Sequence, residues 1–247
     1  MDPEYSSQYA TLYHSHWWWR AREALILDRL RKLVPEDGWD RVLDVGCGDG
    51  LTLGSLAQFA QEVEGLEVDP TIVSPPTLQR YRIHTGVLDD EFDPADRYDL
   101  ITMLDVLEHI QDPVAALQRC RELLAPGGSV LITVPAFRAL WTNHDDVNHH
   151  FTRYTRRTLS EVLQESGLNC LESSYFFQWL VAPKLAVRAY ERLFDARPSH
   201  TRIPAAPLNR GLVLLSRFEQ RTVTRLRVIP GTSLLALASP VGDRTTS

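Results

Sequence analysis

The chain has 247 residues, 44% of them hydrophobic and 23% charged, which is typical of a globular protein with one large domain. Its net charge of −6, from 26 basic and 32 acidic residues, argues against a nucleic-acid-binding protein. No run approaches the roughly 20 apolar residues that cross a bilayer, and the acidic N-terminus lacks the apolar segment of a signal peptide. The three cysteines suggest neither a disulfide framework nor a zinc site. We therefore expect a cytoplasmic protein.

Residues 1–40 precede the first predicted strand and are rich in aromatic side chains. Residues 20–34 alternate apolar and charged side chains at helical spacing. The three consecutive tryptophans Trp17–Trp19 cannot all face one core, because neighbours on a helix point in different directions. We therefore expect at least one of these tryptophans to cover a ligand. The alternative is a helix whose aromatic side packs on the sheet.

Residues 41–50 join an apolar strand to a glycine-rich turn. Gly46, Gly48 and Gly50 stand at alternate positions, and residues 51–59 continue at helical spacing. A strand, a glycine turn and a helix together bind nucleoside-like cofactors, because the missing Cβ atoms let the backbone approach the ligand and the helix start offers free N–H groups.

The acids around this turn favour one cofactor over others. The glycine spacing differs from the dinucleotide fingerprint, and Asp44 and Asp49 would repel a pyrophosphate but suit an ammonium or a sulfonium. S-adenosylmethionine carries both. A second strand, 63–69, places Glu67 about twenty residues after the loop, where an acid can accept hydrogen bonds from both ribose hydroxyls. The alternative is that Glu67 belongs to a solvated strand end.

Further strands are predicted at 81–84 and 98–103. Because ligands bind beyond the carboxyl ends of parallel strands, Asp105, Glu108 and His109 are expected at the site. His109 is either a general base or a structural hydrogen-bonding residue, and we favour the structural role.

The second half of the chain contains a long interruption between two strands. The predicted elements are a helix at 113–124, a strand at 129–134, a helix at 158–166, a strand at 168–176, helices at 183–194 and 208–228, and a last strand at 230–238. We expect residues 177–230 to be a helical insertion, since long inserts cost little closure entropy. This insertion could form one wall of a substrate pocket, or its arginines could contact a membrane surface. Helices that pack on each other and on the sheet are the alternative.

Residues 135–154 follow the fifth strand and concentrate ionisable groups. Trp141 can wall a pocket. The ionisable members are His144, Asp145, Asp146, His149, His150, Arg153 and Tyr154. A neutral imidazole can accept a substrate proton near pH 7, and an adjacent carboxylate can orient it. A metal site of His144, Asp145, His149 and His150 is a second possibility. A third is a structural network in which Arg153 pairs with Asp145 and Tyr154 caps the fold.

Four segments together resemble one family. They are similar to the successive motifs of class I S-adenosylmethionine-dependent methyltransferases, and they occur in the same order between about residues 40 and 170. The segments are Asp44–Gly50, Glu67, 98–109 and 123–128. The segment after the fifth strand resembles that of a subgroup of these methyltransferases, whose members have a tryptophan, then His-Asp, then His-x-x-Arg-Tyr in the same place.

The resemblance implies an α/β fold. Its core is a Rossmann-like, seven-stranded, mostly parallel sheet with an antiparallel last strand. The expected division is a lid at 1–40, a cofactor-binding core at 41–176, a helical insertion or substrate cap at 177–230, and a last strand and tail at 231–247.

The resemblance also implies roles for single residues. Many members carry an acid near the adenine where this chain has Val87, so Asp89 or Asp90 is expected to serve. Arg20 or Arg22 is expected to meet the methionine carboxylate. The cofactor-binding residues are then Asp44, Gly46, Cys47, Gly48, Gly50, Glu67, Val68, Asp89, Leu104, Asp105, Trp18 and Arg20. The catalytic candidates are His144, His150 and His109. The substrate-binding candidates are Trp141, Asp145, Arg153 and Tyr154, and no metal is expected.

The function so implied is methyl transfer from S-adenosylmethionine to a small-molecule acceptor, leaving S-adenosylhomocysteine. The acceptor is a secondary metabolite or a lipid- or sugar-linked intermediate, and O-methylation is favoured, with His144 or His150 as the base. The alternatives are a module that binds the cofactor without transfer and an enzyme that uses it for a different reaction such as cyclisation.

Overall fold

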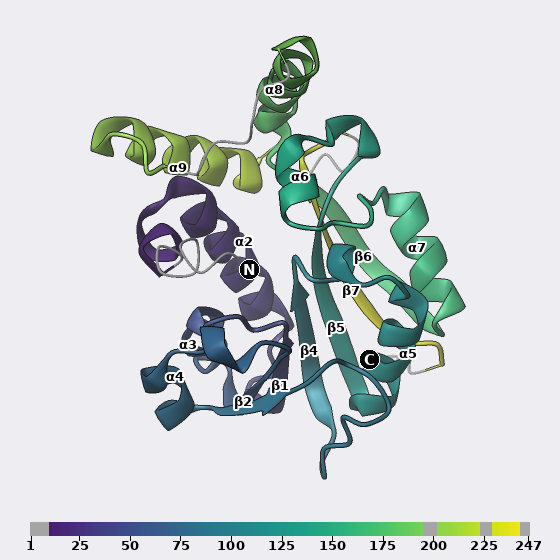
Figure 1. Ribbon diagram of the computed structural model, residues 1–247. Coiled ribbons are helices and arrows are strands. Elements are labelled where there is room, and N and C mark those ends of the chain that lie inside the picture. Colours follow the sequence, from purple (N-terminus) through teal and green to yellow (C-terminus); the bar gives the residue numbers. More distant parts are fainter. Residues whose placement is uncertain (1–9, 195–201, 223–228, 243–247) are drawn as a thin grey trace.

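A computed structural model describes residues 10–194, 202–222 and 229–242. Its centre is one seven-stranded sheet in the order β3-β2-β1-β4-β5-β7-β6 (Figure 1). The strands are β1 (Trp39–Val45), β2 (Ala60–Glu67), β3 (Arg82–Thr85), β4 (Tyr98–Leu104), β5 (Leu124–Pro135), β6 (Leu168–Phe176) and β7 (Ser233–Pro240). The first five pair in parallel, and β7 runs antiparallel between β5 and β6. The predicted fold class is confirmed.

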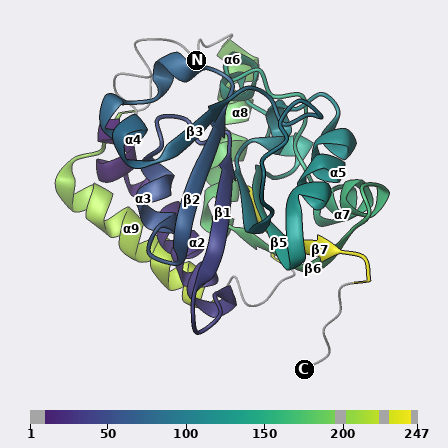
Figure 2. The ribbon, with the colours of Figure 1, turned by 90° about the horizontal axis from the view of Figure 1, so that it is seen from below.

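Helices cover both faces of the sheet. The longer helices are α2 (Trp17–Leu33), α5 (Pro113–Leu123), α7 (Arg156–Glu165), α8 (Val181–Phe194) and α9 (Ala206–Arg221). The short ones are α3 (Leu51–Leu56), α4 (Pro75–Arg80) and α6 (Asn143–Val147), with 3-10 turns at Pro70–Ile72, Leu107–His109, Arg138–Leu140 and Gln178–Leu180. Seen along the sheet, α2, α3 and α9 lie on one side and α5 and α7 on the other (Figure 2).

The two layers follow from the alternation of side chains along each strand. On β1, Leu43 packs with α5 and α7, whereas its neighbour Val42 packs with α2 and α3. On β4, Ile101 and Leu100 divide in the same way. Because both faces are covered, the strands read as continuous apolar runs, which is typical of a parallel sheet.

Several predicted boundaries shift, each for a local reason. α2 begins at Trp17 and not at Arg20, because His16 caps it by accepting a hydrogen bond from the Trp18 N–H. α3 ends at Leu56 and not at residue 59. β5 begins at Leu124, with an irregularity in its pairing to β4 that absorbs the predicted Pro-Gly-Gly turn.

The predicted helical insertion is present between β6 and β7. α8 contacts the 3-10 turns at 138–140 and 178–180, and α9 packs along α2 (Figure 1). The predicted second helix extended to residue 228, and its last part, 223–228, lies outside the described residues. β6 is parallel to β5, so α8 leaves the sheet at the same carboxyl edge as β1, β4 and β5. No helix in the described part of the chain is long and apolar enough to cross a membrane.

Candidate active site

The glycine turn after β1 is open on one side. Gly46 has a φ of 66°, and a Cβ there would stand 2.6 Å from Cγ2 of Val106. Gly48 has a φ of 59°, but nothing lies within 4 Å of the place where its Cβ would be. Glycine adopts this backbone without strain. The open side of Gly48 is therefore where a ligand can approach the main chain.

Two buried carboxylates flank this turn. Asp44 is 2% exposed, and its Oδ1 accepts a 2.6 Å hydrogen bond from Oγ1 of Thr102. Burial raises the pKa of Asp44 to about 7, against the opposing effect of Thr102 and of the Arg22 charge. A carboxylate so placed gains from a cationic ligand, which fits the ammonium of S-adenosylmethionine.

Glu67 ends β2 beside the turn and is 7% exposed. Its carboxylate accepts hydrogen bonds from the N–H groups of Gly48 (2.8 Å) and Asp69 (3.1 Å). A carboxylate offers about four acceptor positions. Two of them remain for further donors, and the role of Glu67 in binding the ribose stays a prediction.

An arginine from α2 reaches the same edge of the sheet. Nη2 of Arg22 lies 2.7 Å from Oδ2 of Asp105 and 3.2 Å from Oγ1 of Thr133. Asp105 has a φ of 58°, which is uncommon outside glycine. Arg20 instead lies on the exposed side of α2. Of the two arginines considered for the methionine carboxylate, Arg22 is the one at the site.

The aromatic start of α2 divides between core and edge. Trp17 is buried in the core cluster with Phe177, whereas Trp18 is half-buried, stacks on Phe177 and lies under the Arg22 guanidinium. Trp17 thus matches the packing alternative. Trp18 stays a candidate for covering the cofactor.

The other predicted cofactor residues lie near the carboxyl ends of the strands. Cys47 is buried in the turn, and Leu104 is half-buried at the end of β4. Val68 and Val87 are exposed. Asp89 caps its own loop by accepting a hydrogen bond from the Glu91 N–H.

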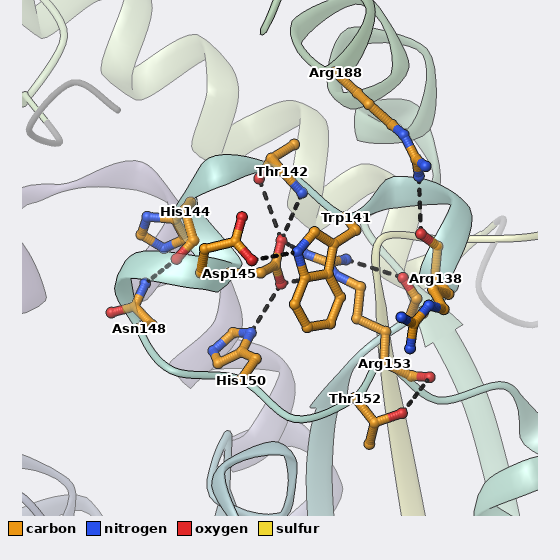
Figure 3. Close-up of polar contacts among 12 residues, drawn as sticks. Arg138, Trp141, Thr142, His144, Asp145, Asn148, His150, Thr152, Arg153 and Arg188 are labelled. Carbon is orange, nitrogen blue, oxygen red and sulfur yellow. Dashed lines mark hydrogen bonds and ion pairs between the residues drawn. The ribbon is translucent and has the colours of Figure 1, made fainter. Parts of the chain in front are cut away.

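The segment after β5 is organised around Asp145, which is fully buried (Figure 3). Its carboxylate accepts hydrogen bonds from Nε (2.7 Å) and Nη2 (3.0 Å) of Arg153 and from the Thr142 N–H (2.8 Å). Nδ1 of His150 lies 2.8 Å from its Oδ1. Burial alone would raise the pKa of Asp145, but the hydrogen bonds of His150 and Arg153 outweigh it and hold that pKa well below its usual range.

Arg153 and Tyr154 are both buried, which favours the structural alternative for them. Arg153 also donates to the carbonyl of Ala136 (3.0 Å), and the Tyr154 hydroxyl donates to that of Leu107 (3.4 Å). These contacts tie the segment to the end of β5 and to the turn after β4.

The turn after β4 brings His109 and Glu108 to His150. The rings of His109 and His150 are 4.6 Å apart between centroids. Burial and the neighbouring His150 lower the pKa of His109. Burial and Asp105 raise the pKa of Glu108 well above its usual range. We call Glu108, His109 and His150 the proton-transfer cluster.

His144, the other base candidate, is exposed, and its ring points away from Arg153 (Figure 3). The predicted metal set is brought together only in part: Asp145 contacts His150 but is also paired with Arg153, and the cluster of possible metal ligands found among the described residues includes neither His144 nor His149. The proton-transfer cluster, however, offers three possible ligand atoms within 4.8 Å of one another.

A groove of about 290 Å³ opens between α8 and the start of α6. Trp141, as predicted, forms one wall, and its Nε1 donates to Asp146 (2.9 Å). The other wall comes from Arg188, Glu191 and Arg192 of α8. These three residues were not individually predictable from the sequence, since they are separated from Trp141 by more than forty positions.

Comparisons with known proteins agree on the fold. Residues 18–173 match the family described as Methyltransferase domain. The ubiquinone biosynthesis O-methyltransferase of Xanthomonas axonopodis pv. citri is 35% identical over 101 residues, which are 38% of this chain and 42% of that protein. The chain thus matches less than half the length of these curated relatives.

Two solved structures are similar in fold. One is a putative methyltransferase in complex with the Haloferax volcanii Trm112 methyltransferase activator, with a TM-score of 0.61, 18% identity, and coverage of 96% of this chain and 94% of that one. The other is an amino pentose methyltransferase of Micromonospora echinaspora with bound S-adenosylmethionine, with a TM-score of 0.50, 20% identity, and coverage of 66% and 90%.

Proposed function

The chain belongs to the Methyltransferase domain family, and on this premise we propose that it transfers a methyl group from S-adenosylmethionine to a hydroxyl group of a small-molecule acceptor. One observation carries the proposal. The acidic glycine turn and the proton-transfer cluster stand at the same carboxyl edge of the sheet, after β1 and after β4. A donor of methyl groups and an acceptor of protons are both needed for O-methylation, and this edge has a site suited to each.

We assign binding of the cofactor to residues around the glycine turn after β1. Glu67 would bind the ribose and Asp44 the ammonium, while the open side of Gly48 admits the ligand. Arg22 would bind the methionine carboxylate from α2. When bound, S-adenosylmethionine supplies an electrophilic methyl group on a sulfonium. The contribution of the protein is mainly to align the acceptor with it.

The acceptor half requires loss of a proton from the hydroxyl. We assign the base role to His150, because Asp145 fixes its Nδ1 and leaves Nε2 free to accept a proton, as in other carboxylate–histidine pairs. His109 and Glu108 would face the acceptor beside it. His144 would border the outer part of the site. The relatives' names as O-methyltransferases support oxygen as the atom methylated.

The groove beside α8 narrows the class of acceptor. Arg188 and Arg192 give it two guanidinium groups against the one carboxylate of Glu191, and Trp141 gives it an aromatic wall. This combination suits an acceptor with a phosphate or carboxylate group and an apolar part. Among the classes considered, a lipid- or sugar-linked intermediate fits better than a neutral secondary metabolite.

The test uses S-adenosylmethionine with an isotopically labelled methyl group and extracts separated into lipid and polar fractions. We expect a labelled product whose methyl group is bonded to oxygen, identified by mass spectrometry and NMR. His150→Ala should lower turnover by ~10²–10⁴-fold with unchanged cofactor affinity, and His144→Ala by much less. Equal losses in both variants would contradict the assignment of the base. Loss of activity on chelation, restored by a divalent metal, would make the cluster a metal site instead. Cofactor binding without product from any fraction would favour a binding module.

A further inference from the structure

The helix α8 directs its charged side chains toward the protein and its apolar side chains outward. Its half-buried positions recur at helical spacing and are Val181, Lys184, Arg188 and Glu191. Arg188 donates to the carbonyl of Arg138 (2.8 Å), and Glu191 accepts from the Asn143 N–H (3.1 Å). The side toward the protein is thus mainly charged, and no residue of α8 is fully buried.

The outward side of α8 is apolar. Leu193 is 76% exposed and Phe194 66%. Leu185, Val187 and Tyr190 are exposed as well. A helix on a protein in water normally buries such a stripe and exposes its charges. Here the apolar residues are the exposed ones. The helix itself projects from one end of the molecule (Figure 1).

The helix α9 shows this inversion only in part, because Leu212 and Val213 pack on the core cluster beside its inward polar residues. Asn209, Ser216 and Glu219 face inward and are buried. Asn209 accepts from the Trp17 N–H (2.9 Å), and Ser216 and Glu219 accept from Trp179. The exposed side carries large apolar residues, namely Leu208, Leu214, Leu215 and Phe218. Two successive helices therefore present apolar faces to the surroundings, with their polar contacts made inside.

Charge and length indicate what covers these faces. At their exposed positions α8 carries one arginine and α9 two, with no acidic residue, whereas the chain as a whole has a net charge of −6. Arg192, Arg210 and Arg221 are exposed beside the apolar residues. At 14 and 16 residues, the helices would extend for roughly 21–24 Å, which is short of a bilayer core of about 30 Å. Apolar stripes flanked by arginines on short helices are typical of helices that lie in the lipid headgroup region.

We propose that the exposed faces of α8 and α9 form a peripheral docking surface for a membrane rich in anionic lipids. The arginines would meet the headgroups and the apolar side chains the acyl boundary. The groove lined by Arg188, Arg192 and Trp141 adjoins this surface, so a lipid-linked acceptor would reach the site from the bilayer. The lipid-linked acceptor in this inference rests on the proposed function, whereas the docking to a membrane does not.

Vesicle co-sedimentation tests the docking without using activity. The full chain is mixed at low salt with vesicles of phosphatidylcholine alone or with equal parts phosphatidylglycerol. We expect binding to the anionic vesicles that falls as salt rises. Leu193→Glu combined with Phe194→Glu should weaken it about tenfold or more. Arg192→Gln should weaken it roughly fivefold. Leu171→Glu, an equally apolar exposed position near the start of β6 and far from α8, is the matched control and should bind as wild type.

The outcomes separate the possible occupants of the surface. Anionic-vesicle binding that the double variant loses and the control keeps supports the proposal. No binding at low salt overturns it, and so does binding that the double variant leaves unchanged. If light scattering shows a dimer that the double variant dissociates, a second copy covers the surface and the membrane assignment is wrong.

Failure of the docking and failure of the proposed function are distinguishable. The double variant should keep the circular dichroism spectrum, the S-adenosylmethionine affinity and the turnover of a detergent-dispersed acceptor, because its positions are exposed and outside the site. Docking with no O-methylation would leave the surface in place and refute the assigned acceptor chemistry.

Discussion

Replacing Asp145 with Asn tests whether the segment after β5 depends on one buried charge. The side chains of Asp145 and Arg153 are 0% and 3% exposed, and they make two short hydrogen bonds to each other. Asn keeps the size but loses the charge, and it leaves the guanidinium buried beside an amide. Breaking a buried ion pair by removing one partner costs about 3–5 kcal/mol.

The assay is urea unfolding together with thermal unfolding. For a chain of this length, about 1 kcal/mol shifts the melting temperature by 2–4 °C, so Asp145→Asn should lower it by roughly 6–20 °C. Glu161→Gln is the matched control, since its pair with Arg157 on α7 is exposed, and it should leave both midpoints unchanged.

The pH dependence of the same variant gives a second readout. The pKa of Asp145 is depressed in the folded chain, so its contribution is present above its usual value of 3.8 and is lost as pH falls below it. The difference in unfolding free energy between wild type and Asp145→Asn should shrink in acid. A loss under about 1 kcal/mol at neutral pH, the size for an exposed pair, would refute this view of Asp145.

Three further predictions concern the cofactor half. Burial raises the pKa of Asp44 to about 7, and an ammonium ligand favours its charged form, so S-adenosylmethionine affinity should rise as pH increases from about 6 to about 8. In calorimetry, the affinity of Asp44→Asn should not change over this pH range. An affinity of the wild type that is equally independent of pH would contradict contact between Asp44 and the ammonium. Glu67→Ala should weaken binding about 10- to 150-fold while Glu62→Gln, exposed on the same strand, does not; equal affinities would remove Glu67 from the ribose. Hydrogen exchange of residues 10–25 and tryptophan fluorescence should change when cofactor binds, whereas equal protection without it would make Trp17–Trp19 part of the core and not of a lid.

The sheet was predictable because its strands have sharp local ends. β6 matches the predicted 168–176, since Gly167 with a φ of 76° precedes it and Phe177, also at positive φ, follows. The start of α2 was placed three residues late because a capping histidine is a weak signal beside Ser, Thr, Asp or Asn.

The site was predictable by location and less so by partner. Sequence order placed Asp44, Glu67, His109 and His150 at one edge, because every parallel strand ends there. The choice of Arg22 over Arg20 depends on which face of α2 meets the sheet. The approach of His109 to His150 depends on a fold-back of forty residues. The inversion of α8 was hidden for a similar reason, since periodicity shows that a helix has two faces but not which one lies inside.

The most direct test of the central claim is transfer of a labelled methyl group from S-adenosylmethionine, followed by mass spectrometry of both products. We expect equimolar S-adenosylhomocysteine and an O-methylated acceptor, with both lost in a Gly46→Val variant whose side chain would meet Val106. Wild-type protein that neither binds S-adenosylmethionine in calorimetry nor forms S-adenosylhomocysteine with any acceptor fraction would contradict it.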